Sequence, residues 1–542
     1  MPVTTIGCSE LDLVTPAEVL KLLSSLPSSK ASSVDVIPVH VLKSCATFFA
    51  PLLAQLANLS FTEGVFPASF KHAQVTPLLK SPGLDPSVPS SFRPISNLRT
   101  IGKIIERLIH SRLLSHLSQS ASFPTLQSGY RANFSTETAL VKLTNDLFAN
   151  AGLGSPSVVL SLDMSAAFDC ISHQKLVDRF RDVFNVSGLA LNWLKSYLCD
   201  RTFCVKVGGE KSSVSNISSG VPQGSVLGPL LFIVYIAPIE HLVNSFSCVQ
   251  QISYADDLTL YMNLKSGTVS NFKLCVNAVR DWLLFNDLLL NPDKSQCMKV
   301  GTRQKLGAFS DPSLDVCGTL VPYSESLKLL GATFDSTLSF DKHISSVCSS
   351  CFYHIRALRH IRKHITPATA SLIATTFIAS KLDYCNAILG GLTKHNLNRL
   401  QHVQNATARA VLNRQARTDP PVLCKSLHWL PIKWRIDYKI AVLTYKTVLT
   451  GAPSYLFDLL NVSKPSRTLR SSRNGLLFEV PFVKTDFESR AFSVYAPRLW
   501  NTLPKNLRDM LSVDPNHQSS SLDTFKCSLK TLFFQYAFAG VV

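Results

Sequence analysis

The chain has 542 residues, of which 46% are hydrophobic and 17% charged, and its formal net charge is +18. This length is sufficient for more than one hydrophobic core. The most apolar stretch, residues 226–239, is too short to cross a membrane and is interrupted by glycine and proline. Residues 1–5 lack the basic start of a signal peptide. We therefore expect a soluble intracellular protein without a membrane partner, and the 14 irregularly spaced cysteines fit reduced thiols.

The positive charge is concentrated in the C-terminal part of the chain. Residues 341–542 contain 27 Lys and Arg against 11 Asp and Glu, a net charge of +16, which leaves +2 for residues 1–340. Such polarity is typical of proteins that bind nucleic acid, because neutralised phosphates release their counterions. Solubility alone is the alternative explanation. Cations alternate with aromatic residues at 428–435, where Trp429 and Trp434 could stack on bases, although core packing is the better interpretation of each.

The first predicted element is a helix that begins after Thr15. Thr15 and Glu18 form a capping-box pattern around Pro16, which occupies the first helical position. We therefore expect a helical N-terminal extension over residues 1–70. The next predicted elements are a strand, a loop and a helix over residues 73–80, 81–86 and 101–115.

Three carboxylates lie at the ends of predicted strands. Residues 158–162 predict a buried strand that ends at Asp163, and a hairpin predicted over residues 249–262 carries Asp256 and Asp257 at its tip. If the strand and the hairpin pair in one sheet, the three carboxylates converge. Hard oxygen ligands of this kind suit Mg²⁺, and two such ions can promote phosphoryl transfer. An ordinary turn is the alternative interpretation of an isolated Asp-Asp pair.

A constrained Gly- and Pro-containing loop at residues 220–224 precedes an apolar helix predicted over residues 226–236. Taken alone, such a loop is more often only a turn. A second hairpin is predicted at residues 326–334, and the pattern becomes mainly helical from residue 342 onward. Ser-rich segments at 463–473 and 512–521 predict exposed loops.

The spacing of Cys348, Cys351, His360 and His364 imitates a zinc site. Apolar residues run through the same segment at helical spacing, and one regular helix cannot bring four such ligands into a tetrahedron. We therefore discount zinc. The basic residues of this helix predict a face that contacts nucleic-acid backbone, and they are Arg356, Arg359, Arg362 and Lys363.

Five motifs follow one another from Phe92 to Lys294. They are Phe92-Arg93-Pro94-Ile95-Ser96, Leu162-Asp163-Met164-Ser165-Ala166-Ala167-Phe168-Asp169, Gly220-Val221-Pro222-Gln223-Gly224-Ser225-Val226-Leu227-Gly228-Pro229, Tyr254-Ala255-Asp256-Asp257 and Leu290-Asn291-Pro292-Asp293-Lys294. In this order they resemble the reverse transcriptase of non-LTR retrotransposons, of the jockey-like kind. The resemblance implies an α+β fold with the right-hand architecture of polymerases. It also implies an RNA-directed DNA polymerase that uses an RNA template, a DNA primer and dNTPs, in the nucleus or the cytoplasm.

The same resemblance implies a domain order. The N-terminal extension (1–70) is followed by fingers and palm (71–340), a helical thumb-like region (341–460) and a basic C-terminal region (461–542). The hairpin at 326–334 resembles the element that grips a primer end, with an ordinary edge hairpin as the alternative.

Residue roles also follow from the resemblance. Asp163, Asp256 and Asp257 are the expected catalytic residues and ligands of two Mg²⁺ ions, for which Mn²⁺ is a possible substitute, whereas Asp169 is assigned to structure. Phe168 is expected to exclude a 2′-hydroxyl, with an ordinary core position as the alternative. The remaining expected nucleotide-binding residues are Arg93, Lys80, Gln223, Gly224 and Lys294. Of these, Arg93 and Lys80 would meet the triphosphate and Lys294 the departing pyrophosphate, although Lys80 is also explained as a solvated surface residue.

Relatives of the jockey kind carry an endonuclease ahead of the polymerase, and we expect none in this chain because it begins close to the fingers. The main alternative is therefore an inactive, truncated copy that acts only as a nucleic-acid-binding protein. An intron maturase is a third possibility, but the 429–434 region does not suggest a splicing-linked domain.

Overall fold

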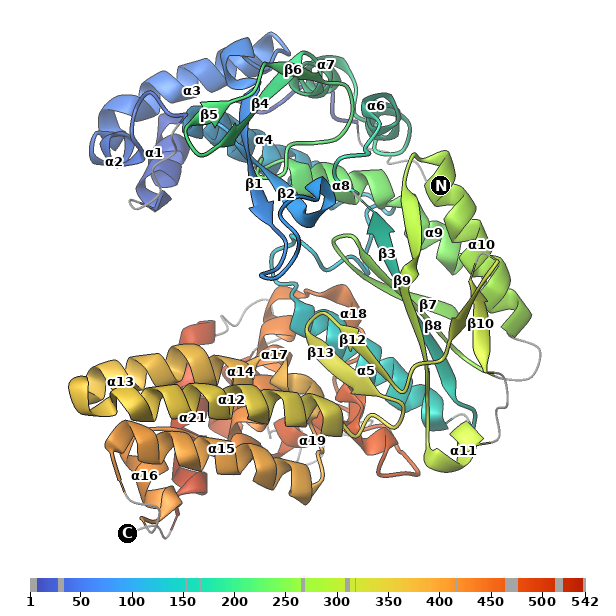
Figure 1. Cartoon of the computed structure of the whole chain (residues 1–542), viewed down its shortest axis with the longest axis vertical. Coiled ribbons are helices and arrows are strands. Elements are labelled where there is room, and N and C mark those ends of the chain that lie inside the picture. The colour runs from blue at the N-terminus through green and yellow to red at the C-terminus, as the bar shows by residue number, and fades with distance from the viewer. Residues whose placement is uncertain are drawn as a thin grey trace. The chain divides into compact units, whose positions relative to one another are not determined.

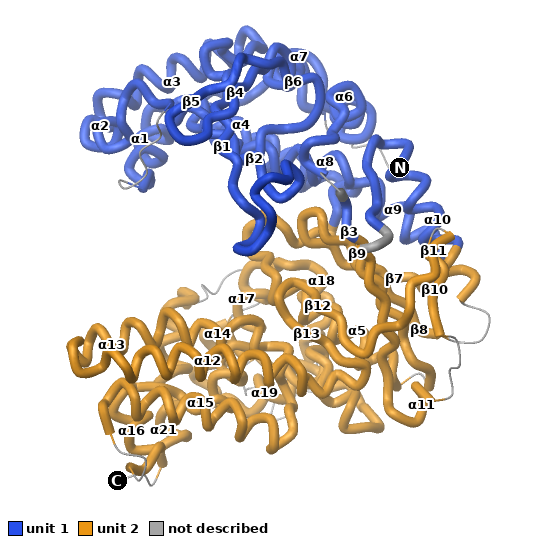
Figure 2. The backbone as a smooth tube through the Cα atoms, in the orientation of Figure 1, with its two compact units in different colours: residues 1–124, 163–247, 274–291 blue, residues 125–162, 248–273, 292–542 orange. Residues whose placement is uncertain are grey.

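The computed structural model describes residues 7–27, 34–152, 154–165, 167–264, 269–307, 312–316, 318–414, 418–463, 476–511 and 520–539. It divides the chain into two compact units (Figure 2). Unit 1 comprises residues 1–124, 163–247 and 274–291, and unit 2 comprises residues 125–162, 248–273 and 292–542. Both contain helices and sheets, so the predicted α+β class is confirmed. Most of the Ser-rich segments 463–473 and 512–521 lies outside the described residues.

Unit 1 contains a five-stranded sheet in the order β2-β1-β4-β5, with β6 paired to β4. The strands are β1 (His72–Leu79), β2 (Phe92–Asn97), β4 (Arg201–Val207), β5 (Glu210–Lys211) and β6 (Ser215–Ile217). β1 pairs antiparallel with β2 and parallel with β4, and Figure 1 shows β1 and β2 running side by side. The predicted strand at 73–80 is therefore confirmed.

Helices complete unit 1. They are α1 (Pro16–Ser25), α2 (Val39–Ser44), α3 (Ala46–Thr62), η1 (Ala68–Phe70), η2 (Pro89–Ser91), α4 (Thr100–Leu117), α6 (His173–Asp182), α7 (Gly188–Leu198), α8 (Gly228–Ile236), α9 (Pro238–Asn244) and the second half of α10 (Val269–Phe285). The side chain of Thr15 accepts a hydrogen bond from the Glu18 backbone N–H at 3.3 Å, which confirms the predicted helix start. The Glu18 carboxylate pairs with Arg112 on α4 at 2.9 Å, and this pair ties α1 to α4.

Most of a four-stranded sheet in the order β7-β8-β3-β9 belongs to unit 2, whereas residues 163–165 of β3 and 289–291 of β9 belong to unit 1. The strands are β3 (Ser157–Ser165), β7 (Val249–Tyr254), β8 (Asp257–Asn263) and β9 (Leu289–Val300). The predicted strand and hairpin are confirmed, because β8 pairs antiparallel with both β7 and β3. Two further hairpins follow, β10 (Ser313–Val316) with β11 (Thr319–Pro322) and β12 (Ser326–Leu329) with β13 (Ala332–Asp335). The second of them confirms the hairpin predicted at 326–334.

The rest of unit 2 is helical, as predicted from residue 342 onward. The helices are α5 (Thr136–Gly152), α11 (Arg303–Gly307), α12 (Asp341–Ile361), η3 (Arg362–His364), α13 (Pro367–Ala374), the π-helical η4 (Thr375–Ala379), α14 (Ser380–Asp383), η5 (Asn386–Leu389), α15 (Lys394–Leu412), α16 (Pro420–Ser426), α17 (Ile432–Thr450), α18 (Ser454–Phe457), η7 (Glu488–Arg490), α19 (Phe492–Thr502), α20 (Lys505–Arg508) and α21 (Leu522–Ala537). In Figure 1, α12, α13 and α15 lie side by side.

One extended apolar core joins the sheet and helices of unit 2. Trp500 is fully buried in it, and its ring lies 5.8 Å from that of Phe525. Trp429 and Trp434 are half-buried and pack against the same core, in agreement with core packing as the better interpretation of each. In the described part of the chain, the cysteines are free thiols and no helix is long and apolar enough to span a membrane.

Candidate active site

The Asp256-Asp257 pair lies at the tip of the β7-β8 hairpin. Tyr254 is opposite Asp257 in the register, so Ala255 and Asp256 form a two-residue turn. The carboxylate-bearing residues are accessible, since Asp256 is half-buried and Asp257 is exposed. Ala255 has a φ angle of 55°, in the left-handed region that costs a residue with a Cβ about 1 kcal/mol or more. The turn therefore requires support from its surroundings.

That support comes from Gln127, which sequence reasoning missed. Its Oε1 accepts a hydrogen bond from the Ala255 N–H at 2.8 Å, and its Nε2 donates to the Ala255 carbonyl at 3.0 Å. Gln127 is only 1% exposed, so these bonds form away from water, where an unpaired amide is most costly. One side chain thus satisfies both polar backbone atoms of the residue that precedes Asp256.

Residues beside Gln127 hold the incoming strand of the hairpin. The Ser128 N–H donates to the Ser253 carbonyl at 2.8 Å, and the Ser253 N–H donates to the Leu126 carbonyl at 3.1 Å. Gly129 lies so close to the turn that a Cβ atom there would be 2.4 Å from the Ala255 nitrogen, so only glycine fits. The side that follows the turn is held by β8 pairing. The hairpin tip is therefore fixed by buried hydrogen bonds rather than by its own sequence.

The electrostatics of the turn involve a neighbouring tyrosine. Desolvation, followed by the charges of Asp256 and Tyr254, raises the pKa of Tyr130. A negative charge that raises a nearby phenol pKa would itself be stabilised by a cation. The hairpin tip is thus an electronegative position on unit 2.

Asp163 lies on β3, directly after the residues of that strand that pair with β8. Leu162 of β3 is opposite Leu258 of β8 in the register. Asp163 is the next residue after Leu162, and Asp257 is the residue just before Leu258. Asp163 is half-buried. Among the described residues, no three His, Cys, Asp or Glu side chains are grouped as a metal site. The carboxylates nevertheless offer the hard oxygen donors that Mg²⁺ prefers.

In unit 1, the loop at 220–224 is tied to the motif that contains Arg93. The Ser96 N–H on β2 donates to the Gln223 carbonyl at 2.8 Å. Gly224 has a φ angle of 122°, and a Cβ atom there would lie 2.7 Å from the Ser96 carbonyl oxygen. Glycine is therefore required by both the conformation and the space. The structure brings together two motifs that are more than a hundred residues apart in the sequence.

The same loop contacts the segment after Asp163. Gln223 Nε2 donates to both carboxylate oxygens of Asp169 at 2.9 Å, and the Val221 N–H donates to the Phe168 carbonyl at 2.9 Å. Desolvation raises the pKa of Asp169, while the hydrogen bond from Gln223 and the charge of Lys80 act in the opposite direction. The bond between Gln223 and Asp169 is consistent with a structural role for Asp169.

Phe168 is half-buried and stacks on Phe232 of α8, with ring centroids 4.9 Å apart and an interplanar angle of 21°. One ring face is thus covered by α8. The backbone of Phe168 is fixed by the loop, as described above, so its side chain is held in a defined position. This arrangement is compatible with both a core role and a nucleotide-facing role.

The cations predicted to meet the nucleotide are exposed. Arg93 lies on β2 opposite Leu78, and Lys80 follows β1 and donates from Nζ to the Ser90 carbonyl at 2.9 Å. Lys294 lies on β9 in unit 2. The four basic residues predicted to bind nucleic acid lie on α12 and η3, where Arg356, Arg359 and Lys363 are exposed and Arg362 is half-buried.

Helix α8 begins at Gly228, two residues later than predicted, and a buried acid binds the amides that precede it. The N–H groups of Val226 and Leu227 donate to Oε2 of Glu106 at 2.6 and 3.1 Å. Glu106 lies on α4 and is 1% exposed, and burial raises its pKa. This carboxylate is a second residue that sequence reasoning missed, and it positions the segment after Gln223 and Gly224.

Comparison with known proteins gives a match over the part of the chain that carries the five motifs. A family model described as Reverse transcriptase (RNA-dependent DNA polymerase) matches residues 79–334. The chain is 29% identical over 412 residues to the RNA-directed DNA polymerase from mobile element jockey of Drosophila melanogaster. The matched region is 74% of this chain and 44% of that protein. The chain is 28% identical to the probable RNA-directed DNA polymerase from transposon BS of the same organism, over 73% of this chain and 44% of that protein.

A third relative matches a larger share of the chain. The probable RNA-directed DNA polymerase from transposon X-element of Drosophila melanogaster is 26% identical over 86% of this chain and 51% of that protein. The chain thus spans about half the length of these relatives. The resemblance predicted from the five motifs is confirmed.

Proposed function

We propose that this chain, whose residues 79–334 form a reverse transcriptase domain of the kind found in non-LTR retrotransposons, catalyses RNA-templated DNA synthesis. The observation that supports this proposal most strongly is the Tyr254-Ala255-Asp256-Asp257 turn, which is held by Gln127 with both aspartates accessible. The turn presents two adjacent like charges at an accessible position, where a bound cation would offset their repulsion. In this activity an RNA template directs the addition of dNTPs to the 3′-hydroxyl of a DNA primer.

The catalytic residues of the proposal are Asp163, Asp256 and Asp257, and they fit a divalent cation by the chemistry of their oxygen donors. Reverse transcriptase domains depend on such a cation, and we propose two Mg²⁺ ions, with Mn²⁺ as a substitute. When bound, the metal stabilises the charge that develops on the attacking and leaving oxygens. The carboxylates hold the cation, and their mutual repulsion makes that binding site selective for positive charge. The pairing of Leu162 with Leu258 supports the participation of Asp163.

The nucleotide-binding part of the proposal rests on unit 1. Phe168 would face the sugar and exclude a 2′-hydroxyl by steric clash. The hydrogen bond from Val221 to its backbone and the stacking on Phe232 support this role, because they hold the ring in a defined position. Gln223 and Gly224 would lie beside the nascent base pair.

Cations complete the nucleotide site in this proposal. Arg93 and Lys80 would contact the triphosphate, and Lys294 would contact the departing pyrophosphate. The exposure of all three side chains supports their availability for a ligand.

The domain layout of the proposal is that of a right hand. Residues 71–340 would form fingers and palm, residues 341–460 a thumb-like helical region and residues 461–542 a basic C-terminal region, after the extension at 1–70. The excess of cations after residue 340 supports nucleic-acid contact by the thumb-like region, with Arg356, Arg359, Arg362 and Lys363 on one helical segment.

A second candidate function is nucleic-acid binding without catalysis, favoured by the net charge of +16 over residues 341–542. Primer extension by the purified full chain separates the two. The assay contains an RNA template, an annealed DNA primer, dNTPs and Mg²⁺, with omission of one dNTP as the control for templated synthesis. Extension that stops at the position of the omitted dNTP is the expected result. Binding of the primer–template without any extension would leave only the second function.

A further inference from the structure

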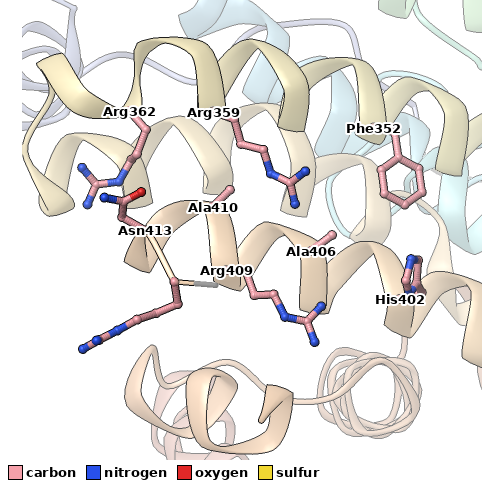
Figure 3. Close-up of a pocket in the computed structure, with 9 residues that line it drawn as sticks. Phe352, Arg359, Arg362, His402, Ala406, Arg409, Ala410 and Asn413 are labelled. Carbon is pink, nitrogen blue, oxygen red and sulfur yellow. The ribbon is translucent and has the colours of Figure 1, made fainter. Parts of the chain in front are cut away.

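A cavity of about 480 Å³ lies between α12 and α15 in unit 2 (Figure 3). Four arginines line it, and no Asp or Glu does. The arginines are Arg359, Arg362, Arg409 and Arg414. Four positive charges around one cavity repel one another, so the arrangement is stabilised by any anion that enters.

One of these arginines has a structural role. Arg362 donates from Nε to the Val411 carbonyl at 2.9 Å and from Nη1 to the Ile365 carbonyl at 3.0 Å. It therefore satisfies a carbonyl in the last turn of α15, as cations near helix C-termini commonly do. Helix stabilisation thus explains Arg362 without any ligand.

The other three arginines are not explained in this way. Within the described part of the chain, the side chains of Arg359, Arg409 and Arg414 form no hydrogen bond and no ion pair. Nε of Arg409 is buried without a partner, which is an unfavourable state for a charged donor. In Figure 3 the guanidinium groups of Arg359 and Arg409 come from facing helices. Three guanidinium groups around one cavity match an anion with several oxygen atoms, such as a phosphate.

An aromatic end distinguishes the cavity from a simple anion site. The rings of Phe352 and His402 also line it, with centroids 5.9 Å apart, and Figure 3 shows them at one end beyond Arg359 and Arg409. Aromatic faces next to cations are the two elements with which proteins bind single-stranded nucleic acid, because bases stack on rings while phosphates meet arginines. A volume of this size is suitable for one nucleotide unit.

We propose that this cavity binds a phosphodiester of single-stranded nucleic acid, with Arg359, Arg409 and Arg414 at the phosphate and Phe352 and His402 at the adjacent base. The inference rests on the proposed function, since it locates one contact between the thumb-like region and the strand that the enzyme copies. It also divides the predicted basic face, because Arg359 and Arg362 line the cavity whereas Arg356 and Lys363 do not.

Two double substitutions that remove the same charge test the proposal. The cavity variant carries Arg359→Gln and Arg409→Gln, and the matched control carries Lys21→Gln and Lys211→Gln, at two exposed lysines of unit 1 for which no nucleic-acid contact is proposed. Affinity for a labelled, unstructured RNA strand is measured by fluorescence anisotropy at several salt concentrations, without dNTPs or metal. We expect the cavity variant to bind at least about tenfold more weakly and to lose about 1.4 from the log–log salt slope, with a much smaller change in the control. An equal loss in both variants, or no loss in either, would overturn the proposal.

Two further measurements keep the result interpretable. Arg409→Lys retains the charge but not the planar fork, so we expect weaker RNA binding with an unchanged salt slope. If Arg409→Gln lowers the melting temperature, Arg359→Gln with Arg414→Gln replaces the cavity variant.

Inorganic phosphate tests whether the cavity is a site for small anions only. A cavity variant that loses phosphate binding but keeps its RNA affinity would contradict the proposal. Because binding is measured without synthesis, failure of the polymerase function would show separately, in primer extension.

Discussion

The side-chain amide of Gln127 binds both polar backbone atoms of Ala255, at 2.8 Å to the nitrogen and 3.0 Å to the oxygen. Ala255 is in a left-handed conformation and immediately precedes Asp256. A buried side chain from a distant part of the sequence thus holds the backbone that presents the aspartates. Gln127 is therefore a positioning residue for the proposed metal site.

We expect Gln127→Leu to reduce primer extension strongly while RNA binding stays within about twofold of the parent. The substitution removes the partner of the buried N–H groups of Ala255 and Gly129 and of the Ala255 carbonyl, at a cost of about 1–3 kcal/mol each, and allows the turn to relax. The metal concentration needed for half-maximal extension should rise, which a general loss of stability would not produce. Gln174→Leu, at an exposed helical position whose hydrogen bond stays within α6, is the matched control. An unchanged metal requirement in Gln127→Leu would argue against positioning.

We expect Phe168→Ala to relax discrimination between dNTPs and rNTPs, because the ring that would clash with a 2′-hydroxyl is removed. Loss of stacking on Phe232 should also cost about 1–2 kcal/mol of stability, since the side chain is only half-buried. The ratio of dNTP to rNTP incorporation is measured on one RNA template. Phe168→Tyr keeps the ring and should keep the discrimination. If Phe168→Ala discriminated as the parent does, Phe168 would be assigned to the core alone.

Glu106 gives a prediction about pH. Burial raises its pKa above the ordinary value of 4.5, so the folded protein binds the Glu106 proton more tightly than the unfolded chain does. This contribution to stability is present at low pH and is lost as the pH rises from about 4.5 through the raised pKa. Glu106→Gln keeps an acceptor for the Val226 and Leu227 amides without a titrating proton. We therefore expect the melting temperature of the variant, relative to the parent, to increase with pH over that window, and a constant difference would contradict this assignment.

Metal removal gives a further prediction. A chelator should abolish extension completely, and added Mg²⁺ or Mn²⁺ should restore it, because the aspartates alone cannot stabilise negative charge on the reacting oxygens. Affinity for RNA should change little in the same titration, since the positive surface lies mainly after residue 340. Extension that continues in excess chelator would contradict the metal assignment.

Local patterns predicted much of the fold. The strand at 158–162, both hairpins and the helix that begins after Thr15 depend on periodicity and capping within a few residues, and the structure confirms them. Contacts between residues far apart in the sequence were not predicted. Gln127 and Ala255 are 128 positions apart, and a buried glutamine next to Ser-Gly resembles a turn in the sequence. Pairing of this kind is determined by tertiary structure and leaves no periodic signal.

For the candidate site, too, the sequence predicted which residues take part but not which of them contact one another. The motif order predicted site roles for Asp256, Asp257, Phe168 and Gln223, but not that Gln223 would donate to Asp169, 54 residues away. Helical spacing placed Arg359 and Arg362 on one segment, but only the position of α15 shows that both line a cavity and that Arg362 also binds the Val411 carbonyl. Charge counts locate a basic region, and neighbouring elements decide which of its side chains are available to a ligand.

The most direct test of the central claim compares Asp256→Asn with the parent protein in two assays, primer extension on an RNA template and binding of the same primer–template. The substitution keeps the size of the side chain and removes the charge that would hold a metal. We predict that extension falls by at least about a thousandfold while binding changes less than about twofold, because the proposed nucleic-acid contacts do not involve this carboxylate. Extension that survives in Asp256→Asn at a rate near that of the parent would contradict the assignment of the Asp256-Asp257 turn as the catalytic metal site.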